Sequence, residues 1–278
     1  MGRLLSNKSS LLFSFLFVFG VTFAQEGNDI NNVKDYKDPK QFTKFRKRRL
    51  FIASWQINQL KKGALVVRLK TNKKLIEVLK KQGKQELAIQ KEAEQLAITK
   101  NTILAYTNKL TFCKVYFIYS DFADSLLRGA RKGIFLDSNL TINPSIEMTE
   151  KFYLIAERDY AYNSSIGFVK QDSAMYVFEA GNPVKEMAVV IKNKYGHQLK
   201  GPFPYCVKDK TYAGVNASVK QYVVLNGKTH LVNIGKQFSK EKLFLYIGVL
   251  DDNLRQFYQS TSTPEIEKIN PEILPFLY

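Results

Sequence analysis

The amino-acid sequence predicts a mixed fold, α/β to α+β, in which a small parallel βαβαβ sheet precedes antiparallel strands and a packed C-terminal amphipathic helix. Three observations predict it. Two apolar runs, 64–69 and 115–119, have the length and the β-branched and aromatic content of strands, and a proline-free stretch of helix-forming residues joins them. Short apolar segments separated by turn residues follow residue 139. An apolar stripe at helical spacing begins at Leu243.

The first 24 residues predict a cleaved secretory signal peptide. Arg3 and Lys8 make the start positively charged, residues 11–19 are almost wholly apolar, and 22–24 end in alanine before Gln25. The apolar run is shorter than the roughly 20 residues that span a bilayer. We therefore expect an exported protein, periplasmic in a Gram-negative-type envelope or secreted, with no transmembrane helix after cleavage.

The rest of the chain divides by composition. Residues 25–41 are polar and predict a disordered leader. Residues 42–260 predict a single mixed α/β domain, with a possible sub-boundary near 139–150. Residues 261–278 form a tail with three prolines. With 45% hydrophobic residues, the chain can bury a sizeable core.

The first half of the domain predicts a helix, a strand and a long helical stretch. Residues 42–60 carry apolar residues near helical spacing, and Trp55 among them is expected in the core rather than at a membrane interface. Asn72 is expected to cap the next helix. One continuous helix over 73–108 would be about 54 Å long. We therefore expect either a bend near Gly83 or a long arm outside the core.

The second half predicts short strands and one strong helix. Residues 122–131 fit a short helix, and 133–136 fit the third parallel strand. Four short apolar segments then predict antiparallel strands; they are 152–156, 166–170, 175–178 and 187–191.

Local turn and cap signals mark the end of the domain. Asn226-Gly227 predicts a hairpin, because a type I′ turn needs positive φ at both central residues. Ser239 is expected to cap the last helix. The acidic pair Asp251-Asp252 within that helix is expected to be solvated, since it lies beside or opposite the apolar stripe.

The positive charge is concentrated in one region. Residues 34–84 contain 17 Lys or Arg and three acids, a net charge of +14, whereas the whole chain carries +17. The densest part is Arg46, Lys47, Arg48 and Arg49. Basic residues beside an anionic leaflet contribute roughly 1 kcal/mol each. This region predicts a non-enzymatic binding protein that needs no cofactor, with an anionic membrane surface, an envelope polymer or a protein as its partner. Export argues against nucleic acid, and a solvated basic face remains the simpler interpretation.

A metal-dependent enzyme acting on a phosphate-containing or cell-envelope substrate is the alternative function. Asp121 follows the second predicted strand, Asp137 follows the third, and Asp124 lies close along the chain. Ligands bind beyond the carboxyl ends of parallel strands, and carboxylate oxygens suit Mg²⁺. The simpler interpretation is that Asp121 caps a helix and Asp137 forms a turn.

Other chemistry has little support in the sequence. His197 and His230 are the two histidines, so multi-histidine metal sites and most histidine-based triads lack parts. Cys113 and Cys206 are the two cysteines, and one disulfide is conceivable in an exported protein. Cys113 starts a predicted strand, and we expect it to be a buried thiol.

Overall fold

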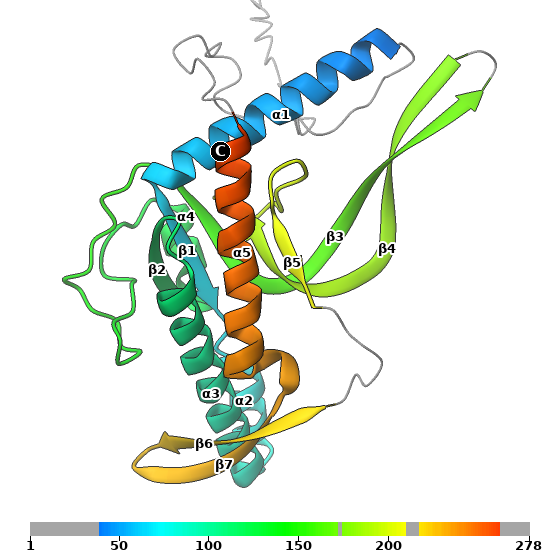
Figure 1. The fold of residues 1–278 in the computed structure, drawn as a ribbon. Helices are drawn as coiled ribbons and strands as arrows, with labels where there is room; N and C mark the ends of the chain where they lie inside the picture. Colours follow the sequence, from blue (N-terminus) through cyan, green and yellow to red (C-terminus); the bar gives the residue numbers. More distant parts are fainter. Residues whose placement is uncertain (1–38, 172–173, 210–216, 262–278) are drawn as a thin grey trace, which may run out of the picture.

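The structure is a computed structural model that describes residues 39–171, 174–209 and 217–261 (Figure 1). Side chains are described within these ranges except those of 39–48 and 162–186. The predicted mixed α/β fold is confirmed. It contains a five-stranded mixed sheet, a separate two-stranded antiparallel sheet and five α-helices among the described residues.

The five-stranded sheet has the order β2-β1-β3-β4-β5. The strands have the bounds β1 Ala64–Leu69, β2 Lys114–Tyr119, β3 Tyr153–Gln171, β4 Ala174–Lys192 and β5 Cys206–Lys208. The central strand β1 is parallel to both β2 and β3, whereas β4 and β5 add antiparallel pairs. The predicted parallel crossover from β1 to β2 is therefore confirmed.

Helices cover both faces of this sheet. Their bounds are α1 Pro39–Lys62, α2 Lys73–Lys81, α3 Gln85–Lys109, α4 Ala123–Leu127 and α5 Lys240–Ser260, with 3₁₀ turns η1 Ser120–Phe122 and η2 Lys236–Phe238. Alternate residues of β1 point to opposite faces. Leu65 and Val67 pack with α1, α3 and α5, whereas Val66 packs with Leu126 of α4 and with Phe135.

Several local predictions are confirmed. The long helical stretch breaks at Gly83, which has φ +73° and separates α2 from α3. The hydroxyl of Ser239 accepts a hydrogen bond from the Lys242 N–H at 3.4 Å and caps α5. Trp55 is in the core and packs edge-on against Phe152 with a centroid distance of 5.3 Å.

The hairpin at Asn226-Gly227 is also confirmed. It joins β6 Ser218–Leu225 to β7 Lys228–Gly235, and both turn residues have positive φ, 51° and 74°. The inner face of this two-stranded sheet packs on α3 through Val223, Val232 and Ile234.

The third parallel strand was predicted in the wrong place. Residues 133–136 form no strand: Leu136 makes one isolated bridge, to Ile142, and its N–H bonds to the Phe117 carbonyl, so the segment touches the edge of β2. Gly133 at φ +75° and the turn at Asp137 leave too short a run for a ladder. The third parallel strand is instead β3, whose residues Tyr153–Ala156 pair with Ala64–Val67.

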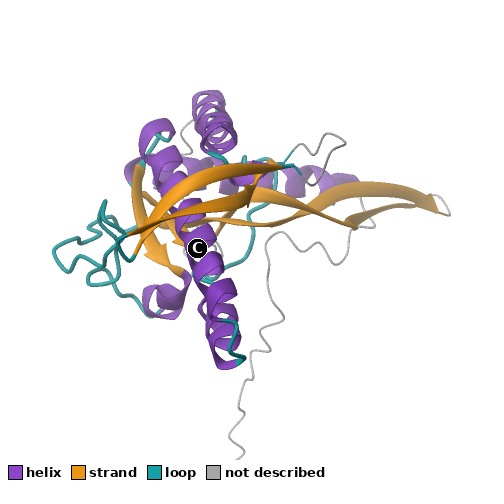
Figure 2. Ribbon diagram, turned by 90° about the horizontal axis from the view of Figure 1, so that it is seen from below, coloured by secondary structure: helices purple, strands orange, loops and turns teal. Residues whose placement is uncertain are grey.

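Four predicted short strands merge into two long ones. β3 and β4 each run for 19 residues and form an antiparallel ribbon with one register shift between Ala161 and Asn163. Residues 181–183, a Gly-Asn-Pro sequence typical of turns, lie inside β4. Figures 1 and 2 show the ribbon extending away from the rest of the molecule.

Three smaller expectations need correction or completion. The helix predicted over 122–131 is confirmed only as η1 and the short α4. Asn72 precedes α2 as predicted, but it has φ 53° and makes no capping bond; its side chain donates to Gln95 instead. Cys113 and Cys206 are not joined by a disulfide, and burial raises the pKa of the Cys113 thiol to about 12.

Candidate functional site

The basic region divides into two separate places. Helix α1, which carries the densest positive charge, lies at one end of the molecule, and the α2–α3 turn lies at the opposite end (Figure 1). The side chains of Arg46, Lys47 and Arg48 fall outside the described ones. The Arg49 side chain is described, and the residue is only 6% exposed, so it is not displayed on the surface. The described part of the candidate site is therefore on α2.

Helix α2 exposes apolar side chains as well as burying them. Ile76 and Leu79 pack against Ala88 of α3 and form a small satellite core. Leu75 and Val78 lie three residues apart on a neighbouring strip of the helix, and each is 48% exposed. The nine-residue helix packs against α3 along one strip only, so the second apolar strip is left in water.

The lysines of α2 and the following turn fall into two groups. Lys73 pairs with Asp121 at 2.5 Å and Lys80 with Glu92 at 3.7 Å. Within the described residues, Lys74, Lys81 and Lys84 form no ion pair. They are exposed, so their charges face solvent.

We define the basic corner as Lys74, Leu75, Val78, Lys81, Lys84 and Leu87, where Leu87 is a further exposed residue in the first turn of α3. Lys74 and Lys81 lie four and three residues from Val78 and therefore flank it on the helix surface. Cationic side chains around exposed apolar ones suit contact with an anionic amphipathic surface. The high charge of this region was evident in the sequence, but the exposure of its apolar residues was not.

Asp121 and Asp137, the carboxylates that the sequence suggested as metal ligands, form hydrogen bonds with nearby groups of the protein. Asp121 accepts from Lys73 and from the Thr71 hydroxyl at 3.0 Å, and the Lys73 ammonium holds the Asp121 pKa below its usual value. Asp137 accepts from the Asn139 and Thr141 N–H groups at 2.8 and 3.1 Å. The Thr141 backbone bond lowers the Asp137 pKa more than any other contact. Asp137 therefore forms the turn expected from the simpler interpretation.

The structure does not assemble a three-carboxylate site from these residues. No group of three metal-ligating side chains is found in the described part of the chain, and Asp121, Asp124 and Asp137 all lie within that part. His197 is exposed in a turn, and His230 is half-buried on β7. Asp121, Asp124 and Asp137 therefore do not form a three-ligand metal site with one another.

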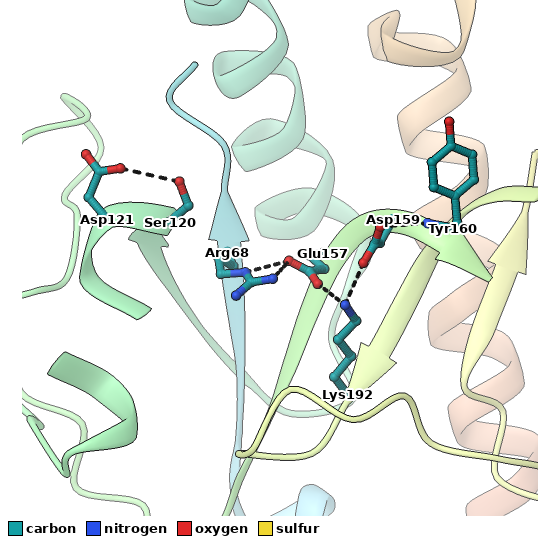
Figure 3. A network of polar contacts seen from close by, with 7 residues as sticks. All are labelled: Arg68, Ser120, Asp121, Glu157, Asp159, Tyr160 and Lys192. Carbon is teal, nitrogen blue, oxygen red and sulfur yellow. Dashed lines mark hydrogen bonds and ion pairs between the residues drawn. The ribbon is translucent and has the colours of Figure 1, made fainter. Parts of the chain in front are cut away.

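A buried ion network that sequence reasoning missed links three strands of the sheet (Figure 3). Glu157 on β3 accepts from Arg68 Nε of β1 at 2.5 Å and pairs with Lys192 of β4, which also reaches Asp159 at 2.6 Å. Burial disfavours the ammonium, but the two carboxylates outweigh it and raise the Lys192 pKa. Since the four charges largely compensate one another, this network is better suited to joining strands than to binding a ligand.

Comparisons with known proteins give no identity. No family, no curated protein and no solved structure matches this chain. Within 39–171, 174–209 and 217–261, no helix combines the length and apolar character needed to cross a bilayer.

Proposed function

We propose that this protein is a non-enzymatic, exported binding protein that attaches peripherally to an anionic lipid surface. The basic corner supports the proposal: Lys74 and Lys81, which form no ion pair among the described residues, flank exposed Val78 next to exposed Leu75, and Lys84 follows in the turn after α2. Charge complementarity favours an anionic leaflet, and the leucine and valine favour a surface with an apolar layer beneath its headgroups.

The expected strength of attachment is modest. Three lysines near an anionic leaflet contribute about 3 kcal/mol at roughly 1 kcal/mol each. That is a factor of roughly 100 in the partition coefficient. The exposed apolar side chains add a hydrophobic contribution to the free energy of binding, which salt does not screen. Arg46, Lys47 and Arg48 on α1 are a second candidate contact, and their distance from α2 lets the two contributions be tested separately.

Export is supported by the predicted signal peptide, which lies outside the described residues. Cleavage before Gln25 would place the basic corner in the cell envelope, where anionic phospholipid headgroups are available. Mass spectrometry of the N-terminus of the native protein tests this. A mature chain that begins at Gln25 is expected, and an intact Met1 on cytoplasmic protein would contradict export.

The test of function is co-sedimentation with vesicles of phosphatidylcholine alone and with phosphatidylglycerol added. Binding is expected only to the anionic vesicles and should weaken as salt rises from about 0.1 M to about 1 M, where the Debye length falls from about 10 Å to about 3 Å. The triple variant Lys74→Gln, Lys81→Gln, Lys84→Gln should lose about 100-fold in partitioning. The double variant Leu75→Asn, Val78→Asn should remove the part of vesicle binding that persists at high salt.

The matched control removes the same charge elsewhere. Lys62, Lys109 and Lys151 are exposed and lie outside the basic corner, so their triple change to Gln should leave partitioning within a few-fold. Equal losses in the two triple variants would show that net charge alone matters. Equal binding to neutral and anionic vesicles, or to neither, would overturn the proposal and leave an envelope polymer or a protein as the partner.

A further inference from the structure

A cavity of about 230 Å³ lies between the central sheet and helices α3 and α5. It lies on the face of the sheet to which Val67 and Leu69 project, and Arg68 and Glu157, which belong to the ion network of Figure 3, also contribute to its wall. Most of its wall is apolar, formed by Val67, Leu69, Ile98, Met187, Val189, Phe238, Leu243 and Ile247. Predominantly apolar walls with a few polar groups are characteristic of small-molecule sites.

The cavity runs from an exposed rim to a buried floor. Lys70 and Asn72 are exposed, and Asn72 donates to Gln95 at 2.6 Å, which fixes the rim to α3. Further along the same stripe of α3, Tyr106 is only 2% exposed. The stripe from Gln95 to Tyr106 spans roughly 16 Å at 1.5 Å per residue.

The Tyr106 hydroxyl is the first unusual feature of this cavity. Tyr106 lines the cavity wall and its ring contacts Phe117, but its hydroxyl makes no hydrogen bond to any described residue. Among the described residues, the hydroxyl oxygen is not one of the fully buried atoms that lack a partner, so it opens onto the cavity, where a ligand can reach it. Burial also raises the Tyr106 pKa, so the phenol keeps its proton and can donate it.

Arg158 is the second unusual feature. Its two terminal nitrogens bind Asp209, one of them at 2.7 Å, and its guanidinium lies over the rings of Phe238 and Tyr246 at 5.2 and 5.5 Å. Its Nε is buried and has no hydrogen-bond partner in the described residues. The side chain is therefore rigidly held, while Asp209 cancels its charge.

Two threonines of α3, Thr99 and Thr102, are further polar groups of the cavity wall. Thr102 already donates to the Ile98 carbonyl, and the Thr99 hydroxyl accepts from Gln95 at 3.4 Å, so its proton is unused. Tyr106, Thr99 and Arg158 Nε therefore each keep a donor without a partner among the described residues, and the Arg68–Glu157 and Arg158–Asp209 pairs at the wall are each neutral overall. A buried anion would not be compensated here, whereas a neutral acceptor such as a carbonyl oxygen would be.

We propose that this cavity binds a small neutral molecule with an apolar body and one carbonyl or comparable acceptor, hydrogen-bonded by Tyr106. At roughly 30 Å³ for each water-sized group, about eight non-hydrogen atoms fit. A medium-length aliphatic ketone has this size and chemistry. The site is separate from the basic corner and does not depend on attachment to a membrane.

Calorimetric titration of the full mature chain with heptanone, octane and heptanoate tests the proposal. Heptanone should bind most tightly, octane more weakly because it lacks an acceptor, and heptanoate more weakly because its charge is not compensated. Tyr106→Phe keeps the ring and removes the hydroxyl, and it should weaken heptanone binding by about tenfold. Tyr116→Phe is the matched control, since the Tyr116 hydroxyl bonds Glu150 at 2.9 Å and its ring packs on the opposite face of the sheet.

Two further results complete the test. Val189→Phe should fill the cavity and abolish binding, with thermal unfolding used to show that the variant is folded. Failure of heptanone to bind the unmodified protein, or equal affinity of the unmodified protein and Tyr106→Phe, would overturn the proposal. Heptanoate binding tighter than heptanone would overturn the assignment of a neutral ligand. None of these outcomes bears on vesicle binding.

Discussion

Asp251 ties the last helix to the loop that precedes β2. Its carboxylate accepts from the Thr111 and Phe112 N–H groups at 2.8 and 2.7 Å and from Arg255 Nε at 2.7 Å. The expectation that Asp251 is solvated was wrong, because residues 140 positions earlier in the chain supply its partners. The neighbouring Asp252 is exposed, as expected.

Asp251→Ala is predicted to lower the free energy of unfolding by about 2–3 kcal/mol, since hydrogen bonds to a charged group contribute about 1.5–3 kcal/mol and two backbone donors lose their partner. Asp252→Ala should change it by less than about 0.5 kcal/mol. Urea denaturation of both variants measures the difference. Similar losses in the two would show that the contacts of Asp251 contribute nothing specific.

The contacts of Asp251 also predict how the stability of the protein depends on pH. Burial opposes the charge, but Arg255 and the two backbone donors outweigh it, so the Asp251 pKa lies below its usual value. A carboxylate with a depressed folded pKa stabilises the fold above the unfolded pKa, about 3.9, and loses that contribution as pH falls through the folded value. The stability gap between the unmodified protein and Asp251→Ala should therefore be full at neutral pH and shrink below about pH 4. A gap that is constant with pH would contradict this.

Glu157 is predicted to be the most sensitive member of the buried network. Its side chain is 2% exposed and faces Arg68 and Lys192. Glu157→Gln leaves Arg68 without its carboxylate and Lys192 with Asp159 alone, and it should cost about 3–5 kcal/mol. The double variant with Lys192→Met should cost less than the sum of the single changes, which a double-mutant cycle by urea denaturation measures. Additive costs would show that the pair is not coupled.

At the scale of elements, the junction between α1 and β1 requires glycine. A Cβ on Gly63 would lie 2.4 Å from the Phe152 carbonyl oxygen and 2.8 Å from that of Gln59, and both are backbone atoms. Gly63 thus lets the end of α1 lie directly against the backbone that leads into β3. Gly248 in α5 is the opposite case, because nothing lies within 4 Å of its added Cβ.

Gly63→Ala is predicted to destabilise the protein by several kcal/mol, since backbone on two elements must move. Gly248→Ala should stabilise it by roughly 0.5–1 kcal/mol through better helix propensity. Thermal unfolding of the two variants distinguishes them. A tolerated alanine at position 63 would show that α1 can shift away from β3 at little cost.

The elements that sequence predicted well are those that local chemistry determines. Ser239 capped its helix, and Asn226-Gly227 formed its hairpin, because each depends on a few neighbouring residues. The third parallel strand was misplaced because β1 can pair with any apolar run that reaches its edge, and Tyr153–Ala156 occupies it.

In the candidate sites, too, the sequence predicted what neighbouring residues determine and missed what tertiary contacts determine. The excess of lysines on α2 was evident from the sequence, but whether Leu75 is buried depends on how α2 meets α3. The cavity could not be predicted at all, since Tyr106 and Arg158 are 52 positions apart and come together only through the sheet.

At the scale of the molecule, β1 is the best protected element. Ala64 to Val67 are at most 1% exposed and are paired on both sides. The β6–β7 sheet has two strands, and its outer face leaves Tyr222 71% exposed and Leu231 50% exposed.

Native-state hydrogen exchange should therefore be slowest in peptides that cover 64–69 and much faster in those that cover 218–235, because exchange there needs only local opening. Mass spectrometry of deuterium uptake measures this. Comparable protection of both segments would mean that the two sheets open as one cooperative unit.

The central place of β1 also has a consequence during synthesis. Its partner residue on β3 comes late, since Ile155 pairs with Val66 from 89 residues further along the chain. At about 5–20 residues per second, β1 waits roughly 4–18 s at the ribosome before that partner is made. Throughout this interval the apolar edge Leu65-Val66-Val67 has no β3 beside it. Under the export proposed above, this late pairing would help keep the chain unfolded until it has crossed the membrane.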